Sequence, residues 1–160
     1  ISPLAFVDSA AKLGKNVTVQ PFAYIEGDVE IGDDCTIMSG ARILAGTRMG
    51  QGNKVHHGAV LGTTPQDFHY TGENSLLIIG DRNDIRENVV VSRAAHESDA
   101  TRIGNDNYLM DGVHLCHDVQ IGNHCVIGLK TILAGECHVN DYTILSSNVI
   151  LHQNCHIGSW

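Results

Sequence analysis

The segment VHLCHDVQIG, Val113 to Gly122, holds the residues of this sequence best suited to acid–base chemistry. His114 and His117 lie three residues apart, and Asp118 directly follows the second histidine. A neutral imidazole exchanges protons near neutral pH, and an adjacent carboxylate fixes its tautomer and supports its protonated form. His117 is therefore the candidate general base, with Asp118 as its orienting partner. Cys116 lies between the histidines, but nothing in the pattern places a basic group beside its sulfur to activate it.

The bulk composition limits the classes of partner and compartment. The chain has 160 residues, a formal charge of −8 and 5% aromatic residues, and one domain spanning residues 1–160 is expected. The negative charge argues against nucleic acid and anionic membranes as partners. No apolar run approaches the ~18 residues that span a bilayer, and no signal segment opens the chain. The five cysteines include no C-x-x-C pair, which favours a reduced, cytoplasmic protein.

An aliphatic residue occupies every sixth position over most of the chain. The series runs from Ile1 to Leu61, from Ile79 to Val91 and from Ile103 to Ile157. A small residue follows four positions later, and glycine often follows the aliphatic residue directly, where we expect it to permit a turn. This pattern is typical of an all-β fold, the hexapeptide-repeat parallel β-helix, with three hexapeptides in each triangular coil. Four cysteines fall in the small position and are expected to be buried thiols: Cys35, Cys125, Cys137 and Cys155.

Residues 18 positions apart stack on one another in such a β-helix, about 4.8 Å apart along its axis. His117 lies two residues after the interior Leu115, at an outward position, and its stacking line continues to Gly135 and Gln153. Acyl transfer to a hydroxyl requires a base that removes the hydroxyl proton and an N–H that stabilises the oxyanion. Gly135 leaves its amide unobstructed, so His117 and Gly135 together predict an acyltransferase site.

Two segments interrupt the repeat without changing its phase. Residues 62–78 carry proline, glycine and polar residues, and residues 92–102 form a second interruption. Both are expected to be loops extruded from the β-helix, and loops on a rigid framework commonly carry binding residues.

From about residue 60 to residue 157, the chain resembles the UDP-N-acetylglucosamine 3-O-acyltransferases of lipid A synthesis. The resemblance lies in PQDFHYTGE (65–73), IGDRNDIRENVVVSR (79–93), IGNDNYLMDGVHLCHD (103–118), TILAGE (131–136) and LHQNC (151–155). The first 60 residues fit the same family through the phase of the repeat. The resemblance implies a left-handed β-helix that assembles as a homotrimer, with active sites at subunit interfaces and with no metal or organic cofactor.

The resemblance also implies a reaction and a set of site residues. An acyl group, often 3-hydroxyacyl, would move from acyl carrier protein to the 3-hydroxyl of UDP-N-acetylglucosamine, the first step of lipid A synthesis. His117 matches the family's general base, Asp118 the aspartate beside it and Gly135 the oxyanion glycine. The substrate-facing positions of the family correspond to Gln66, Asp67, His114, His152 and Gln153.

Several positions depart from the family's pattern. His69 stands in place of a lysine, Ser92 in place of a histidine, Glu136 in place of the histidine after the oxyanion glycine, and Ser146-Ser147 in place of Gly-Gly. His69 and Glu136 remain candidate substrate-binding residues, and the loss of basic groups points to an altered acceptor. The family continues beyond Trp160 into further coils and a helical domain. The chain is therefore expected to be either a fragment or a short paralogue with another donor, such as acyl-CoA.

Three other functions stay open from the sequence. A paralogous sugar O- or N-acyltransferase would keep the chemistry and change the acceptor, for example to a 3-amino sugar. A zinc enzyme of the carbonic-anhydrase type would need His117, His152 and His156 to converge from different phases of the repeat. A non-catalytic scaffold would leave the His117–Asp118 pair unused.

Overall fold

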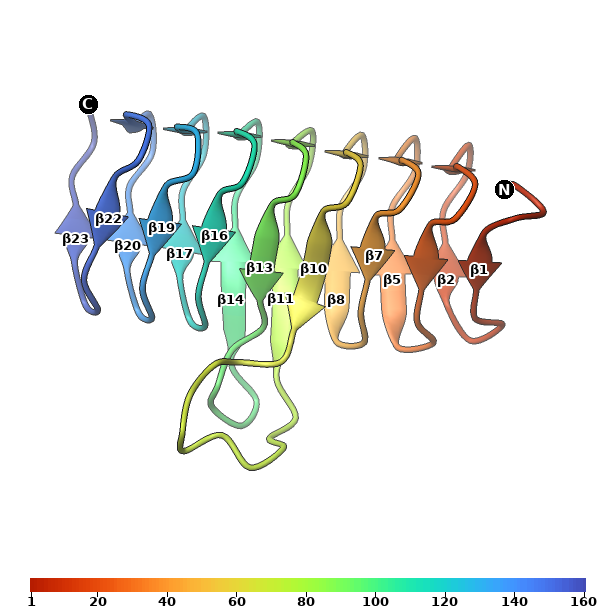
Figure 1. Ribbon diagram of the computed structural model, residues 1–160, viewed down its shortest axis with the longest axis horizontal. Helices are drawn as coiled ribbons and strands as arrows, with labels where there is room; N and C mark the ends of the chain where they lie inside the picture. Colours follow the sequence, from red (N-terminus) through yellow and green to blue (C-terminus); the bar gives the residue numbers. More distant parts are fainter.

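The computed structural model describes residues 1–160 and contains 23 short β-strands and no α-helix. The strands form three parallel sheets, here named A, B and C, of eight, eight and seven strands. Successive strands along the chain visit the three sheets in turn, so three strands make one coil (Figure 1). The chain is a left-handed parallel β-helix, which confirms the β-helix predicted from the hexapeptide repeat and the handedness implied by the resemblance. No helix with the length and apolarity to cross a membrane is present.

Each strand forms one side of a triangular coil and is accordingly two to four residues long. Sheet A contains β1 (Phe6–Val7), β4 (Tyr24–Ile25), β7 (Arg42–Ile43), β10 (Val60–Thr63), β13 (Val90–Ser92), β16 (His114–Leu115), β19 (Ile132–Leu133) and β22 (Ile150–Leu151). Sheet B contains β2 (Lys12–Leu13), β5 (Val29–Ile31), β8 (Thr47–Met49), β11 (Leu76–Ile79), β14 (Ala100–Ile103), β17 (Gln120–Ile121), β20 (His138–Val139) and β23 (His156–Ile157). Sheet C contains β3 (Thr18–Val19), β6 (Thr36–Ile37), β9 (Lys54–Val55), β12 (Asp84–Ile85), β15 (Tyr108–Leu109), β18 (Val126–Ile127) and β21 (Ile144–Leu145).

The repeated aliphatic positions fill the interior of the β-helix. Leu115 pairs with Leu133 across neighbouring coils of sheet A, and both side chains are fully buried. Burial of such columns removes apolar surface from water at every coil, which is the main force that holds short strands together. The predicted small position is also confirmed, since three of its cysteines are buried, the fourth is half-buried and all are free thiols: Cys35, Cys125, Cys137 and Cys155.

The glycines that follow the aliphatic residues were expected to permit turns, and this expectation is wrong for most of them. The left-handed backbone conformation falls two residues later, for example at Asn16 and Asp34, with φ of 56° and 57°. Asparagine and aspartate tolerate this conformation better than other non-glycine residues. A Cβ at Gly32 would instead lie 2.7 Å from the carbonyl carbon of Gly50 in the next coil. These glycines are needed because neighbouring coils approach closely.

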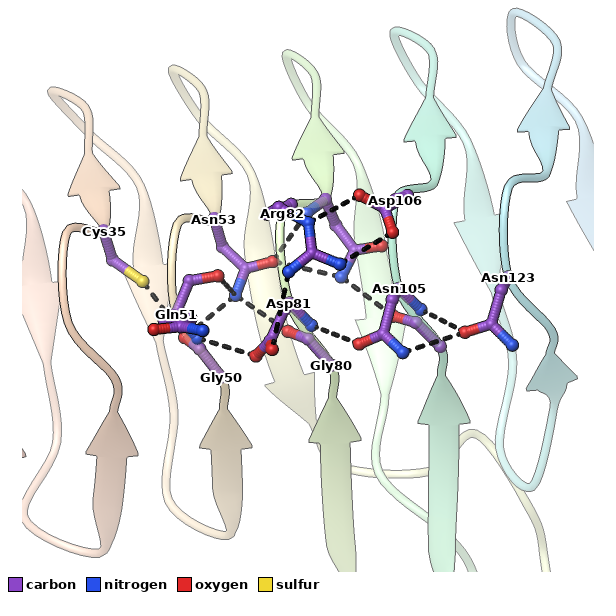
Figure 2. A network of polar contacts seen from close by, with 12 residues as sticks. Cys35, Gly50, Gln51, Asn53, Gly80, Asp81, Arg82, Asn105, Asp106 and Asn123 are labelled. Carbon is purple, nitrogen blue, oxygen red and sulfur yellow. Dashed lines mark hydrogen bonds and ion pairs between the residues drawn. The ribbon is translucent and has the colours of Figure 1, made fainter.

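Ladders of polar side chains run along the corner between sheets B and C. Inside the corner, the amide N–H of Asn83 donates to Asn53 Oδ1 at 2.9 Å, and that of Asn107 donates to Asn83 Oδ1 at 2.9 Å. Outside it, the Asp81 N–H donates to Asn105 Oδ1 at 2.7 Å, and the Asn105 N–H to the next coil (Figure 2). Each coil thereby satisfies backbone donors that its turn leaves without a strand partner.

Both interruptions of the repeat are loops, and both leave the corner between sheets A and B (Figure 1). The first loop, residues 64–75, joins β10 to β11, and the second loop, residues 93–99, joins β13 to β14. Both are shorter than the expected segments 62–78 and 92–102, because strand pairing continues into Thr63 and Ser92 and begins again at Leu76 and Ala100. The two loops belong to adjacent coils and therefore lie beside each other.

Candidate functional site

The candidate base lies at the corner that carries the two loops. His117 follows β16, Gly135 follows β19 and Gln153 follows β22, so the three residues occupy the same turn position in successive coils. Backbone hydrogen bonds connect these turns, from the Glu136 N–H to the His117 carbonyl at 3.1 Å and from the Asn154 N–H to the Gly135 carbonyl at 3.2 Å. The repeat thus places the predicted stacking line on a rigid framework.

Asp118 fixes the orientation of the His117 ring. Its Oδ2 lies 2.8 Å from His117 Nδ1 and also accepts the amide N–H of Ala95 at 3.0 Å. Asp118 itself has a φ of 62°, and its own N–H donates to Thr101 Oγ1 at 2.8 Å. With Nδ1 engaged by the carboxylate, Nε2 is the ring nitrogen that remains to exchange a proton.

His117 is buried, although its position in the repeat is outward and not in the core. Only 5% of His117 and 7% of Asp118 are accessible. The two loops explain the difference, because Ala95 of the second loop binds Asp118 and residues of the first loop line the same groove as His117. The repeat set the direction of the side chain correctly, but burial depends on loops whose path the repeat does not determine.

Gly135 lies directly against the imidazole, as the 18-residue spacing predicted. A Cβ at this position would lie 2.5 Å from His117 Cε1 and 2.6 Å from Nε2. The Gly135 amide N–H donates to no other backbone group. The N–H groups at several equivalent turn positions, such as Gly27 and Gln153, are likewise without an acceptor, whereas that of Ala45 donates to Glu26 Oε2 at 2.7 Å. The glycine therefore presents an unengaged N–H beside the candidate base.

A groove with a volume of about 560 Å³ contains His117 and most of the predicted substrate-facing residues. The residues that line it are Gln66, Asp67, Phe68, His69, His96, His117, Glu136 and Gln153. Asp67 accepts the His69 backbone N–H at 2.9 Å, and its Oδ1 lies 3.2 Å from the His69 ring. The backbone N–H holds the pKa of the Asp67 carboxyl below its usual value, so this carboxylate is ionised at neutral pH.

Two predicted substrate-facing residues do not line this groove. His114 lies in β16 on the outer face of sheet A, where burial lowers the pKa of its imidazole. His152 follows β22 and is exposed. Neither residue belongs to the groove of its own chain, because their positions in the repeat direct them away from the turn that carries His117.

A second groove, of about 530 Å³, is lined by Asp118 among other residues and has no apolar lining residue. Its lining residues are His96, Asp99, Arg102, Asp118, Gln120, Glu136, His138, Asn154 and His156. His96 Nε2 lies 4.0 Å from Glu136 Oε1, and both residues line both grooves. Sequence reasoning did not single out His96 or Phe68, and the only signal for them was their place in the two interruptions of the repeat.

The other catalytic candidates find no support in the geometry. Burial, with a smaller contribution from Cys137, raises the pKa of the Cys116 thiol, which is the opposite of nucleophile activation. The three histidines of the zinc alternative do not converge, because His156 lines the second groove and His152 lines neither groove.

Comparison with known proteins identifies close relatives over nearly the whole chain. A family model described as bacterial transferase hexapeptide (six repeats) matches residues 10–45, 30–63 and 100–128, which together exceed half of the chain. The chain is 41% identical to an acyl-(acyl-carrier-protein)–UDP-N-acetylglucosamine O-acyltransferase of Stutzerimonas stutzeri, over 99% of this chain and 62% of the relative. The corresponding enzyme of Pseudomonas putida is 40% identical over the same shares. The chain thus spans less than two thirds of the length of these relatives.

Solved structures give the same result. A UDP-N-acetylglucosamine acyltransferase from Bacteroides fragilis is 48% identical, with a TM-score of 0.97 over 99% of this chain and 62% of that one. The acyltransferase of Francisella novicida is 35% identical, with a TM-score of 0.95 over 98% of this chain and 58% of that one. The repeat, the β-helix and these relatives together place the chain in the bacterial transferase hexapeptide family.

Proposed function

We propose that the chain is the β-helical part of an acyltransferase that moves an acyl group from acyl carrier protein to the 3-hydroxyl of UDP-N-acetylglucosamine. The observation that carries this proposal is the unengaged Gly135 N–H stacked against a buried His117–Asp118 pair. The names of the relatives in Stutzerimonas and Bacteroides support the choice of donor and acceptor.

The reaction requires one proton transfer in each direction. His117 Nε2 removes the proton from the acceptor hydroxyl as its oxygen attacks the thioester carbonyl. The negative charge on the carbonyl oxygen of the tetrahedral intermediate is stabilised by the Gly135 N–H. Collapse of the intermediate breaks the carbon–sulfur bond, and the protonated His117 returns the proton to the leaving thiolate. Asp118 keeps the ring in the required tautomer and stabilises its charged form.

The remaining groove residues bind and orient the substrates. Gln66, Asp67 and His69 come from the first loop, whereas Glu136 and Gln153 come from the coils, so the groove has one wall from each source. Two carboxylates, those of Asp67 and Glu136, line the groove, and Glu136 stands where the resembled family has a histidine. This charge favours hydrogen bonding to neutral sugar hydroxyls over binding of phosphate groups within this part of the groove.

We also propose a homotrimer in which sheet A faces a neighbouring subunit. The outer row of sheet A is largely apolar and exposed at Phe6, Tyr24, Ile132 and Ile150, with 51%, 37%, 39% and 73% of each residue accessible. His114 belongs to this row. A copy that covers this face would bring His114 and His152 to the groove of its neighbour, which accounts for their absence from the groove of their own chain. No cofactor is needed for these steps, and the cytoplasmic location stays a prediction.

The test is a mass-spectrometric transfer assay. UDP-N-acetylglucosamine and its 3-amino analogue are each paired with a series of acyl-carrier-protein and acyl-CoA donors of different chain length. His117→Ala should abolish product formation and leave the β-helix folded. His124→Ala provides the matched control, because His124 lies at the corner between sheets B and C, where its ring stacks on Tyr142 at 4.9 Å.

The outcomes separate the proposed function from its alternatives. A product that requires His117 and the carrier-protein donor supports the proposal, and the acceptor used identifies the sugar. A product only with the 3-amino acceptor or only with coenzyme A would replace the proposed substrates by those of a paralogue. The absence of product from every pair, with folded protein, would overturn the proposal.

A further inference from the structure

The tip of the first loop, residues 64–73, carries Gln66, Asp67 and His69 into the groove, yet it is barely attached to the β-helix. Its hydrogen bonds are internal, such as those from Thr71 and Gly72 to the Glu73 carboxylate, with one exception. The exception is the hydroxyl of Tyr70, which accepts a hydrogen bond from Arg93 Nη2 at 2.9 Å. A single polar contact therefore joins this wall of the groove to the rest of the molecule.

Arg93 is placed to act as a bridge between the loop and the coils. Its Nη1 donates to the Ala45 carbonyl at 3.1 Å, and its guanidinium carbon lies 5.9 Å from the centre of the Tyr70 ring. Its backbone N–H donates to the Thr63 carbonyl at 3.0 Å, at the start of the first loop. The arginine stem lies beside Gly46, where a Cβ would be in ordinary contact with Arg93 Cδ, at 3.6 Å.

The positive charge of Arg93 is not neutralised by an ion pair. No carboxylate of the chain forms a salt bridge with it. Its Nε is buried and has no hydrogen-bond partner. An unpaired guanidinium with a buried, unused donor is an unfavourable way to stabilise a fold. Residues that break such rules tend to occur where function requires a fixed geometry.

We propose that Arg93 is a positioning residue, which holds the tip of the first loop against the groove by binding the Tyr70 hydroxyl and the Ala45 carbonyl at the same time. This inference rests on the proposed function only for its kinetic consequence. The planar guanidinium suits the task because its two terminal nitrogens reach two acceptors on different segments, which a lysine ammonium on a flexible stem does less well.

The structural test is amide hydrogen exchange of residues 64–73, measured without substrate in Arg93→Met and Tyr70→Phe. Loss of a hydrogen bond from a charged donor changes the equilibrium constant for local opening by about 10-fold or more. Both variants should therefore raise the amide exchange rate of this segment by about 10-fold. The double variant should exchange no faster than Tyr70→Phe, which also removes the hydrogen bond from the Tyr70 hydroxyl to the Glu73 carbonyl at 3.1 Å. Tyr108→Phe is the matched control, because Arg86 Nη1 donates to the Tyr108 hydroxyl at 3.0 Å and its guanidinium carbon lies 5.9 Å from that ring, away from both loops.

The kinetic test uses the same variants. Loss of the loop's position should lower kcat/KM for the acceptor by about 10-fold, chiefly through KM, because the loop touches substrate in both ground and transition states. Unchanged exchange of residues 64–73 in Arg93→Met would overturn the proposal. Faster exchange with unaltered kcat/KM would also overturn it. If the wild-type chain transfers no acyl group, the proposed function fails, while the exchange comparison still decides whether Arg93 holds the loop.

Discussion

A methyl group at position 135 would collide with the imidazole of His117. In Gly135→Ala the new Cβ would lie 2.5 Å from His117 Cε1, whereas ordinary contact begins near 3.4 Å. Either the ring or the turn must therefore move by about 1 Å. The ring is held by a 2.8 Å contact with Asp118, and the turn is held by the hydrogen bonds that join Glu136 to His117 and Asn154 to Gly135. No rotation of a flexible side chain relieves the collision.

Under the proposed mechanism, both ways of relieving the contact should damage catalysis. Moving the ring breaks its alignment with Asp118, and moving the turn displaces the Gly135 N–H from the oxyanion. A displacement of about 1 Å at a reacting group costs about 100-fold in rate, and loss of one oxyanion donor costs about 100- to 1,000-fold. We therefore expect kcat to fall at least 100-fold. Because the substitution lies at an outer turn and removes no core contact, the Tm should change little.

The assay compares kcat, KM and Tm of Gly135→Ala with those of Gly27→Ala. Gly27 occupies the same turn position of the same corner, between β4 and β5, several coils away from the site. A Cβ at Gly27 would lie 3.0 Å from Oδ1 of Asp8, whose side chain can move. The control should keep wild-type kinetics. If Gly135→Ala keeps kcat within a few-fold of the wild type at an unchanged Tm, the assignment of this glycine as the oxyanion donor beside the base is refuted.

Three further predictions concern orientation, titration and the polar ladder. Asp118→Asn should lower kcat by about 1,000-fold or more through loss of the preferred imidazole tautomer, whereas Asp34→Asn, at an equivalent left-handed turn, should leave kcat unchanged in the same assay. Burial lowers the pKa of His114, so just below about pH 6.5 the unfolded chain binds more protons than the folded chain. The free energy of unfolding therefore falls as the pH drops through that range. Urea titrations at several pH values should show a smaller decline for His114→Gln than for the wild type. Asn83→Ala leaves the buried N–H of Asn107 without its acceptor and should lower the free energy of unfolding by about 1–3 kcal/mol in urea titrations.

The fold could be predicted from the sequence because its information is periodic. One aliphatic residue in six, in constant phase, determines which side chains enter the core and which residues stack on one another. The contact between His117 and Gly135 follows from this spacing alone. The role of the glycines after the aliphatic residues could not be read in the same way, because glycine serves both a left-handed turn and a close approach of two backbones. Only the structure distinguishes these two roles, as the close approach of Gly32 to the Gly50 backbone shows.

The loops were recognised as loops, but their effect on the site was not predicted. The burial of His117 depends on the hydrogen bond from Ala95 to Asp118 and on the path of residues 64–75. These contacts are made once, between segments without a common period, so no spacing rule applies to them. The role of Arg93 is not predictable for the same reason, since its two acceptors, Ala45 and Tyr70, are remote from it in sequence.

The contacts that could be predicted lie in the coils and those that could not lie in the loops, and the two regions carry residues with different proposed roles. His117, Asp118 and Gly135 belong to the coils, where the repeat fixes their geometry, whereas Gln66, Asp67 and His69 belong to a loop attached through one hydrogen bond. The groups proposed to transfer the proton and stabilise the oxyanion are thus positioned by the coils, although the first loop contributes to the burial of His117. Substitutions in the coils should act on kcat, and substitutions in the loop should act on KM and on the choice of acceptor. In the proposed mechanism, the acyl-transfer chemistry can be kept while the acceptor changes, which is why the presence of His69 in place of a lysine is expected to alter specificity before it alters the reaction.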